Sequence, residues 1–188
     1  MANRNSRKNR NSIRLREYDY SKSGWYYVTI CTKDHKEYFG KVKNEDMILN
    51  DIGKIADEYW RKIPLHFPYS SLDKHIIMPN HIHGIIIIDC KKDAKFASST
   101  NNTSMNVGDA NLASQDRTKM ELSKIIQQFK RAVTIKIKYN KPISNFKWQR
   151  SFYDRIIRNE NELYNIRKYI QQNPLKWDLE RNIINWDI

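Results

Sequence analysis

A run of four isoleucines, residues 85–88 within "HIHGIIIID" (81–89), is the sequence feature that most constrains the fold. Short apolar runs that end at a polar residue, here Asp89, are typical of buried strands. The preceding segment "SLDKHIIM" (71–78) is also strand-like, and the "PN" between the two segments favours a tight turn. Together the two segments predict a β-hairpin whose second strand is buried.

The N-terminal half contains two further predicted elements. "GWYYVTICT" (24–32) is rich in aromatic and β-branched residues, which predicts a central strand. "MILNDIGKIADEYWRKIP" (47–64) begins as a short strand and then changes to helical spacing of its apolar residues. Asn50 or Asp51 is a suitable N-cap for this helix, and Pro64 marks its end.

The C-terminal half is predicted to alternate helix, strand and helix. From Lys119 an apolar stripe recurs at helical spacing, which predicts a second helix. "FKWQRSFYDRIIR" (146–158) is a strand candidate, and "NENELYNIRKYIQQ" (159–172) predicts a third helix that stops at the "NP" of 173–174. We expect the last residues to pack back on the body.

This order of elements predicts an α+β fold. An antiparallel sheet with helices packed on one face, of ferredoxin-like kind, accommodates it. The 188 residues suit a single domain, 1–188. Within it, residues 1–16 form a basic arm without acidic residues, and the Ser-, Asn- and Thr-rich segment 91–118 is predicted to be a long mobile loop.

Net charge narrows the class of partner. The formal charge of +13 favours a polyanion, and nucleic acid is the leading candidate. The sequence has neither an apolar stretch near 20 residues nor an acylation signal, so a membrane partner is not expected. It also shows no secretory signal, so a cytoplasmic location is predicted. The isolated Cys31 and Cys90 are expected to be reduced, inert thiols.

His81 and His83 are the first candidate site residues. In a strand, residues i and i+2 point to the same side, so the two imidazoles lie side by side. They stand where the strand begins, before it becomes wholly apolar, which would anchor metal ligands on a rigid element. The alternative is a structural role, in which the histidines are hydrogen-bonded inside the fold.

The third predicted helix offers a partner for this pair. Tyr169 and Asn173 are four residues apart and so share one helical face. If that face packs over His81 and His83, the Asn173 amide oxygen completes a metal site of two histidines and one oxygen. Tyr169 could then attack a phosphodiester and form a covalent phosphotyrosine. Alternatively, Tyr169 is an aromatic residue that fills the core.

Three segments in order, "MPNHIHGIIII", "WQRSFYDRIIRNENEL" and "YIQQNP", resemble the REP-associated tyrosine transposases, a single-tyrosine branch of the HUH nuclease superfamily. The N-terminal "RNSIRLREYDYSKSGWYYVTICT" is also similar to the opening of such proteins. The resemblance implies a ferredoxin-like HUH core, an HUH motif at residues 81–83, Tyr169 as nucleophile and Mg²⁺ or Mn²⁺ as cofactor. It further implies single-stranded DNA, often beside a hairpin, as substrate, and a monomer or homodimer. Related transposases carry glutamine at the position of Asn173.

Two rivals and a basic surface complete the set of candidates. Tyr153 is an alternative nucleophile and Asp154 an alternative ligand. Between Glu121 and Asp154 there are eight basic residues and no acidic one, beside aromatic residues on which bases could stack. The nucleic-acid-binding candidates are Arg14, Arg16, Lys130, Arg131, Trp148, Arg150, Arg155, Arg158, Arg167 and Lys168.

These features together predict a metal-dependent single-stranded DNA endonuclease and strand transferase that cleaves near a hairpin through a 5′-phosphotyrosine. A second hypothesis is a domesticated hairpin-DNA or RNA-binding protein without turnover. A third, an RRM-like RNA-binding module, has no use for the two histidines, and the sequence contains no aromatic RNP signature for it.

Overall fold

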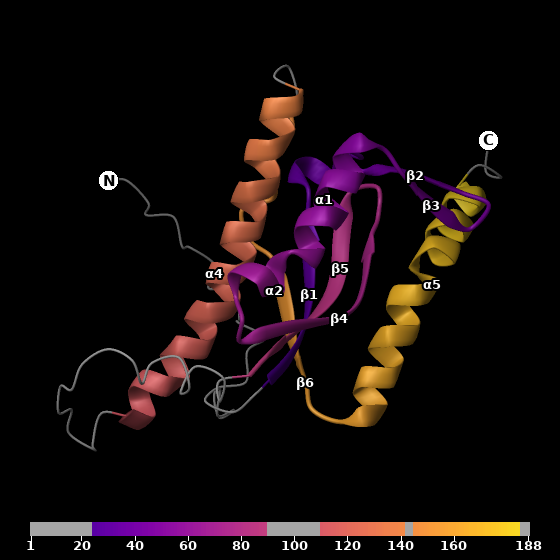
Figure 1. Cartoon of the computed structure of the whole chain (residues 1–188). Coiled ribbons are helices and arrows are strands. Elements are labelled where there is room, and N and C mark those ends of the chain that lie inside the picture. The colour runs from indigo at the N-terminus through magenta and orange to yellow at the C-terminus, as the bar shows by residue number, and fades with distance from the viewer. Residues whose placement is uncertain (1–23, 90–109, 142–144, 185–188) are drawn as a thin grey trace, which may run out of the picture.

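The computed structural model describes residues 24–89, 110–141 and 145–184 (Figure 1). The basic arm 1–16, with Arg14 and Arg16, lies outside the described residues, as does most of the predicted loop. The elements are, in chain order, β1 (Gly24–Cys31), a 3₁₀ turn (Lys33–His35), β2 (Gly40–Lys43), β3 (Asp46–Leu49), α1 (Asp51–Arg61), α2 (Ile63–His66), β4 (Ser70–Ile77), β5 (His81–Ile88), α4 (Ala110–Asn140), β6 (Tyr153–Ile157) and α5 (Glu160–Ile184).

Four strands form the central sheet, in the order β4, β5, β1, β6, and every neighbouring pair is antiparallel. If the small β2–β3 hairpin is set aside, the chain runs β1, α1, β4, β5, α4, β6, which is the ferredoxin-like βαββαβ arrangement. The predicted α+β class, the central position of β1 and the β4–β5 hairpin are therefore confirmed.

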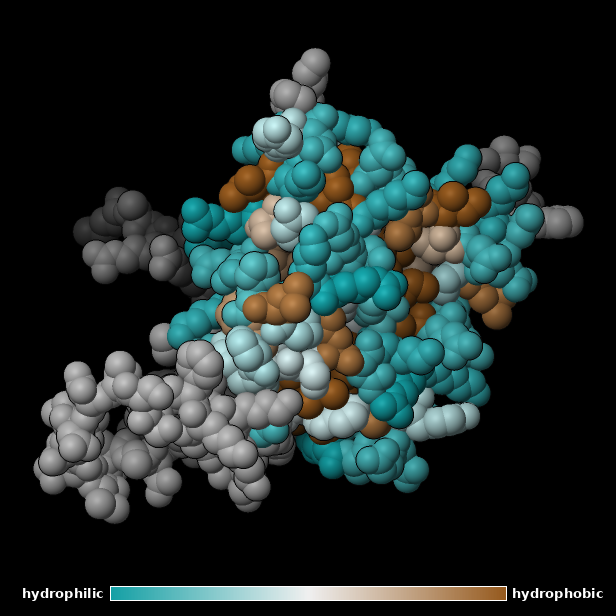
Figure 2. Space-filling view, viewed as in Figure 1, coloured by the Kyte–Doolittle hydropathy of each residue, from teal (hydrophilic) through white to brown (hydrophobic). Residues whose placement is uncertain are grey.

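One face of the sheet packs against α1 and α4 and carries the larger core. Tyr26, Val28 and Ile30 alternate along β1 toward this face, as the two-residue period of a strand requires. The Asn50 side chain caps α1 by accepting a hydrogen bond from the Gly53 amide at 3.0 Å, as predicted. The outer surface visible in the same view is mostly hydrophilic (Figure 2).

The opposite face of the sheet packs against α5. Its smaller cluster consists of Tyr27, Ile85, Ile157, Leu163, Ile166 and Ile170. The prediction that all helices share one face was therefore wrong: α1 and α4 share a face, and α5 covers the other. The physical reason lies in the isoleucine run, since adjacent residues Ile85 and Ile86 point to opposite sides and both need covering.

Helix α5 continues to Ile184, with Pro174 inside it, so the predicted stop at residues 173–174 was wrong. An internal proline removes one helical hydrogen bond and costs roughly 3 kcal/mol. Contacts on both sides of the proline offset this cost, because Ile170 enters the core and the Trp177 ring lies 5.8 Å from that of His81. Tertiary packing thus overrides the local signal.

Three smaller differences concern element lengths. The predicted loop 91–118 ends earlier, because α4 begins at Ala110. The strand predicted at 146–158 is reduced to β6, since the preceding residues are held differently: Trp148 forms an isolated bridge with Thr32. The β2–β3 hairpin was not predicted as a pair; its turn residues Asn44 and Glu45 have φ values of 51° and 64°, as a type I′ turn requires.

Candidate active site

His81 and His83 lie side by side at the start of β5, on the sheet face that α5 covers. Their ring centroids are 4.5 Å apart. In the neighbouring strand β1, His81 is opposite Cys31 and His83 is opposite Thr29. The alternation of the strand therefore brings the two imidazoles together, as the sequence predicted.

Hydroxyl groups from β1 fix the ring of His83. Its Nδ1 lies 2.7 Å from the Tyr27 hydroxyl and 2.9 Å from Thr29 Oγ1, and the side chain is buried. Burial raises the pKa of Tyr27, so this group stays a neutral hydroxyl. Because both bonds use Nδ1, the nitrogen available as a metal ligand is Nε2. Sequence analysis did not identify Tyr27 or Thr29 as partners.

Asn80 fixes the ring of His81 in a comparable way. Its Oδ1 lies 2.6 Å from His81 Nδ1, while its Nδ2 donates to the His35 carbonyl at 3.1 Å. The second bond sets the orientation of the amide, so an oxygen faces the imidazole and Nδ1 is the protonated nitrogen. A carbonyl oxygen that accepts from the remote nitrogen is the usual support of a metal-binding histidine. From the sequence, Asn80 was interpreted only as a turn residue.

Both imidazoles are neutral at ordinary pH. Burial lowers the pKa of His81 to about 4, although its hydrogen bond with the Asn173 side chain acts in the opposite direction. Burial, followed by the neighbouring His81, lowers the pKa of His83 to about 3. Neutral imidazoles are the form that binds metal ions.

Helix α5 brings Tyr169 and Asn173 to this pair. The Tyr169 ring lies 5.3 Å from that of His83 and 6.4 Å from that of Tyr27, and the residue is 41% exposed. Asn173 is 6% exposed and bonds to His81. The side chains thus converge although about 90 residues of sequence separate β5 from this part of α5.

Two residues further along α5 join the site without having been predicted. Lys176 Nζ lies 5.7 Å from the centre of the Tyr169 ring, and Trp177 packs on His81. They follow Tyr169 by seven and eight positions, which is two helical turns, so the same stripe of α5 carries all of them. That helical period could have identified them, had the helix not been expected to end before Pro174.

The three side chains that the sequence predicts as metal donors, those of His81, His83 and Asn173, lie together in the structure. Within the part of the chain that the structure describes, no group of three or more His, Cys, Asp or Glu residues could hold a metal ion. The neutral, oriented imidazoles fit a divalent cation, and a mixed nitrogen and amide-oxygen set suits Mn²⁺ better than Mg²⁺, which prefers oxygen ligands. Two or three protein ligands leave positions open for substrate.

The rival residues have different positions. Tyr153 is opposite Thr29, which in turn is opposite His83, so Tyr153 lies in the same row across the sheet and is 42% exposed. Asp154 is opposite Val28, whose side chain belongs to the α1 and α4 face. Asp154 therefore points away from the histidine pair.

Several of the predicted nucleic-acid-binding residues have partners within the protein. Lys130 Nζ donates to the carbonyls of Gln149 and Ser151 at 2.9 and 3.1 Å, and burial lowers its pKa to about 8. Trp148 packs against the larger core and donates to the Lys130 carbonyl at 3.1 Å. Ion pairs join Arg155 to Glu162 and Arg167 to Asp73.

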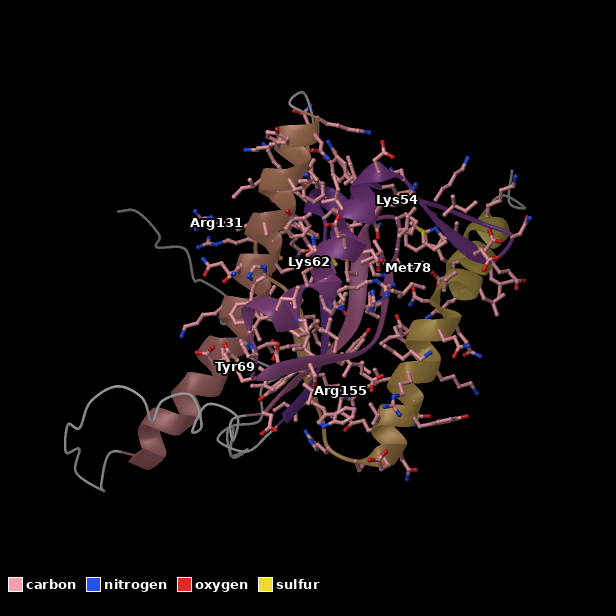
Figure 3. The ribbon with its side chains drawn as sticks, viewed as in Figure 1. Lys54, Lys62, Tyr69, Met78, Arg131 and Arg155 are labelled. Atoms are coloured by element: carbon pink, nitrogen blue, oxygen red, sulfur yellow. The ribbon has the colours of Figure 1, made fainter. Side chains whose placement is uncertain are left out.

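The remaining candidates in the described residues are exposed: Arg131, Arg150, Arg158 and Lys168. In Figure 3, Arg131 points from α4 into solvent, whereas Arg155 lies near the start of α5, where its acidic partner is. Within the described residues these four side chains have no ion pair, unlike Arg155 and Arg167, so their charges are available to a polyanion. None of the helices in the described residues is both long and apolar enough to cross a membrane.

Comparisons with known proteins gave the following similarities. No protein-family model matches the chain. The structure of a REP-associated tyrosine transposase bound to a REP hairpin is 18% identical and aligns with a TM-score of 0.45, covering 87% of this chain and 73% of that one. A candidate transposase from Deinococcus radiodurans is 15% identical, with a TM-score of 0.43, covering 84% of this chain and 95% of that one.

Similarity in sequence is higher to an uncharacterized protein of Haemophilus influenzae. The two are 37% identical over 172 residues, which cover 92% of this chain and 92% of the relative. At this identity and coverage, the chain belongs to the same family as that Haemophilus influenzae protein.

Proposed function

We propose that the chain is a transposase-like, metal-dependent endonuclease and strand transferase for single-stranded DNA, with Tyr169 as nucleophile. One observation carries the proposal: α5 presents Tyr169 and Asn173 to two neutral histidines on β5. A tyrosine that only fills the core would be buried, whereas Tyr169 is 41% exposed and can be reached by a polymer. The histidines are held through Nδ1, as metal ligands commonly are.

The reaction is a displacement at phosphorus. The Tyr169 oxygen forms a bond to phosphorus and loses its proton to solvent, while the bond from phosphorus to the 3′ oxygen breaks. That oxygen takes up a proton and leaves as a free 3′ hydroxyl, and the 5′ end stays attached to Tyr169. Attack by another 3′ hydroxyl on the phosphotyrosine joins two strands and regenerates the tyrosine.

Each side chain has a defined part in this proposal. His81, His83 and Asn173 would hold the metal, which when bound supplies Lewis-acid stabilisation of charge on the phosphate. Lys176, with its ammonium 5.7 Å from the centre of the Tyr169 ring, would place a positive charge beside the bound phosphate. Asn80, Tyr27 and Thr29 hold the imidazoles in place.

Single-stranded DNA near a hairpin is the proposed substrate. The formal charge of +13 supports a polyanion, and the exposed Arg131, Arg150 and Lys168 supply free cations. Preference for a single strand beside a hairpin rests on the sequence resemblance described above. The chain would act as a monomer or as a homodimer.

A second function, hairpin binding without turnover, is favoured by one observation. Asn173 is a neutral and short third donor, and no third His, Cys, Asp or Glu joins the pair in the described residues. Neutral amide ligands bind divalent ions more weakly than carboxylates do, so the metal could be lost. The basic surface would then serve binding alone.

Covalent trapping distinguishes these functions. Wild-type protein is incubated with labelled single-stranded hairpin DNA and Mn²⁺, Mg²⁺ or EDTA, and the products are resolved on a denaturing gel. We expect an adduct that requires metal, Tyr169 and the histidines, so that Tyr169→Phe and the His81→Ala, His83→Ala double variant form none. Tyr153→Phe is the matched control, because it lies in the same row and should keep the adduct.

Other results have clear meanings. Tight hairpin binding without any adduct would support the second function. An adduct that disappears only in Tyr153→Phe would place the nucleophile on β6 instead of α5. Asn173→Gln, which lengthens the amide by one methylene, is expected to form adduct at lower metal concentration if residue 173 is a ligand.

A further inference from the structure

A lysine-rich cavity lies on the other side of the sheet from Tyr169. It has a volume of about 490 Å³ and is lined by Lys33, Thr134, Lys138, Asn145, Phe146, Lys147 and Trp148. The lining thus contains three lysines and no acidic residue. Thr134 and Lys138 belong to α4, so the cavity is on the α4 side.

In the part of the chain that the structure describes, these three lysines have no charged partner, unlike the ion-paired Arg155 and Arg167. Lys33, Lys138 and Lys147 are exposed, and the described residues contain no ion pair or side-chain hydrogen bond for them. By contrast, Lys130, which like Lys138 belongs to α4, donates hydrogen bonds to the carbonyls of Gln149 and Ser151. Three unpaired ammonium groups around one hollow repel one another, and an anion between them would relieve this repulsion.

Backbone pairing connects the cavity to the histidine pair. The Lys33 amide donates to the Lys147 carbonyl at 2.9 Å, which joins the two sides of the cavity. The preceding residue, Thr32, donates from its amide and its hydroxyl to the Asn80 carbonyl, both at 2.9 Å. Asn80 in turn bonds to His81. The cavity and the site therefore share the same end of the sheet.

The arrangement of the helices agrees with this placement. Helices α4 and α5 flank the sheet, and their C-terminal ends lie at the same end of it (Figure 1). Lys138 is in the last turns of α4, and Lys176 and Trp177 are in the C-terminal half of α5.

We propose that this cavity binds backbone phosphates of the single-stranded DNA on one side of the cleavage position, as a second contact on the α4 face. The inference rests on the proposed function for its ligand. Lysines act as point charges and suit phosphates without reading bases, so binding here is independent of sequence. Phe146 and Trp148 are packed in the core and form the floor of the cavity.

Salt dependence of DNA binding tests this inference. Fluorescence anisotropy is measured with an unstructured single strand of about 20 nucleotides, in EDTA, over a range of salt concentrations. Each phosphate contact contributes about 0.7 to the slope of log K against log salt for single strands. The variant Lys33→Gln, Lys138→Gln, Lys147→Gln is expected to lower this slope by about 2.

A matched control removes the same charge elsewhere. Lys41, Lys43 and Lys54 are exposed residues of β2 and α1, and their triple glutamine variant should lower the slope by less than about 0.7. An equal decrease in both triple variants would overturn the proposal, because net charge alone would explain it. An unchanged slope in the cavity variant, or an equal decrease with double-stranded DNA, would also overturn it.

Binding of DNA in the cavity and the proposed reaction at Tyr169 can be tested separately. Binding in EDTA requires neither metal nor Tyr169, so the slope is measurable even if no adduct ever forms. If the reaction occurs, the cavity variant should need more DNA for half-maximal adduct while the maximal rate stays unchanged. A lower maximal rate at saturating DNA would instead assign these lysines to the chemistry and overturn a role in binding alone.

Discussion

The two faces of the central sheet differ in the kind of side chain that they bury. The face toward α1 and α4 buries an extensive apolar cluster that includes Trp60, Ile125 and Ile137, all at 0% exposure. The face toward α5 has a smaller apolar cluster and, beside it, the buried polar side chains of His83 and Asn173. One strand, β5, contributes to both faces through alternate residues.

This difference separates a face that mainly stabilises the fold from the face on which we propose that the chemistry takes place. Buried polar groups cost free energy unless they are hydrogen-bonded, and the buried side chains of His83 and Asn173 both have hydrogen-bond partners. The α4 face also buries a polar atom, Trp60 Nε1, for which the described residues contain no hydrogen-bond partner, but its more extensive apolar cluster can stabilise the fold. We therefore expect stability and adduct formation to respond separately to substitutions on the two faces.

The largest expected effect is on the α4 face. Trp60 packs against Gly84 so closely that a Cβ at position 84 would lie 2.2 Å from its ring. Trp60→Ala is expected to lower the free energy of unfolding by about 3–5 kcal/mol, because it leaves a large cavity. Urea denaturation followed by circular dichroism measures this loss. The molecules that remain folded should still form the adduct, and a stable but inactive Trp60→Ala would show that the α4 face takes part in the reaction.

The next effect concerns the core of the α5 face. Ile170 is 1% exposed and directly follows Tyr169. Ile170→Ala should cost about 2–5 kcal/mol, and the loss should loosen α5 more than α4. Native-state hydrogen exchange by mass spectrometry is the appropriate measurement. Faster exchange confined to α5 would show that the two faces unfold separately, whereas equal acceleration in α4 would show that they unfold as one unit.

The sequence was informative wherever local patterns determine structure. The hairpin around "PN", the adjacency of His81 and His83 and the shared helical face of Tyr169 and Asn173 all follow from the periods of strands and helices. These periods also indicated the buried stripe of α4. The βαββαβ order followed from the succession of such patterns.

What the sequence did not predict depends on contacts between distant residues. Nothing local shows that Tyr27 and Thr29 bond to His83, or that Asn80 supports His81, because register across strands decides these pairs. Pro174 is a strong local stop signal, and only packing on both sides of it maintains the helix. The isoleucine run, apolar on alternate sides, could have indicated that both faces are covered.

The pH dependence of the free energy of unfolding tests how much His81 and His83 destabilise the fold. In the absence of metal, the folded-state pKa values of His81 and His83, about 4 and about 3, lie below the unfolded value near 6.5. Unfolding then takes up protons, so stability is fully present above pH 6.5 and is lost as pH falls toward the folded values. Between pH 6.5 and 5 this loss is roughly 1.5 kcal/mol for each histidine.

Denaturation midpoints across this pH range provide the test. The His81→Gln, His83→Gln variant, studied in EDTA, should show a weaker decrease in stability on acidification than wild type. His66→Gln, at an exposed position of α2, is the matched control and should follow wild type. Identical pH profiles for the double variant and wild type would mean that the histidines do not titrate as buried groups.

The smallest expected effect on stability concerns the ion pair between α5 and strand β4 of the sheet. Arg167 lies in α5, two positions before Tyr169. It donates hydrogen bonds from both Nε and Nη2 to Asp73 of β4. The pair is partly exposed, so Asp73→Asn should cost only about 0.5–1 kcal/mol of stability.

Adduct formation should fall by a larger factor than stability suggests, because a tilt of α5 moves Tyr169 relative to His83. Single-turnover rates at saturating DNA, set beside Lys74→Gln as a control on the same strand, measure this. If the rate falls only in proportion to the unfolded fraction, the ion pair stabilises the α5 face without positioning the nucleophile, and the two faces are more alike than proposed.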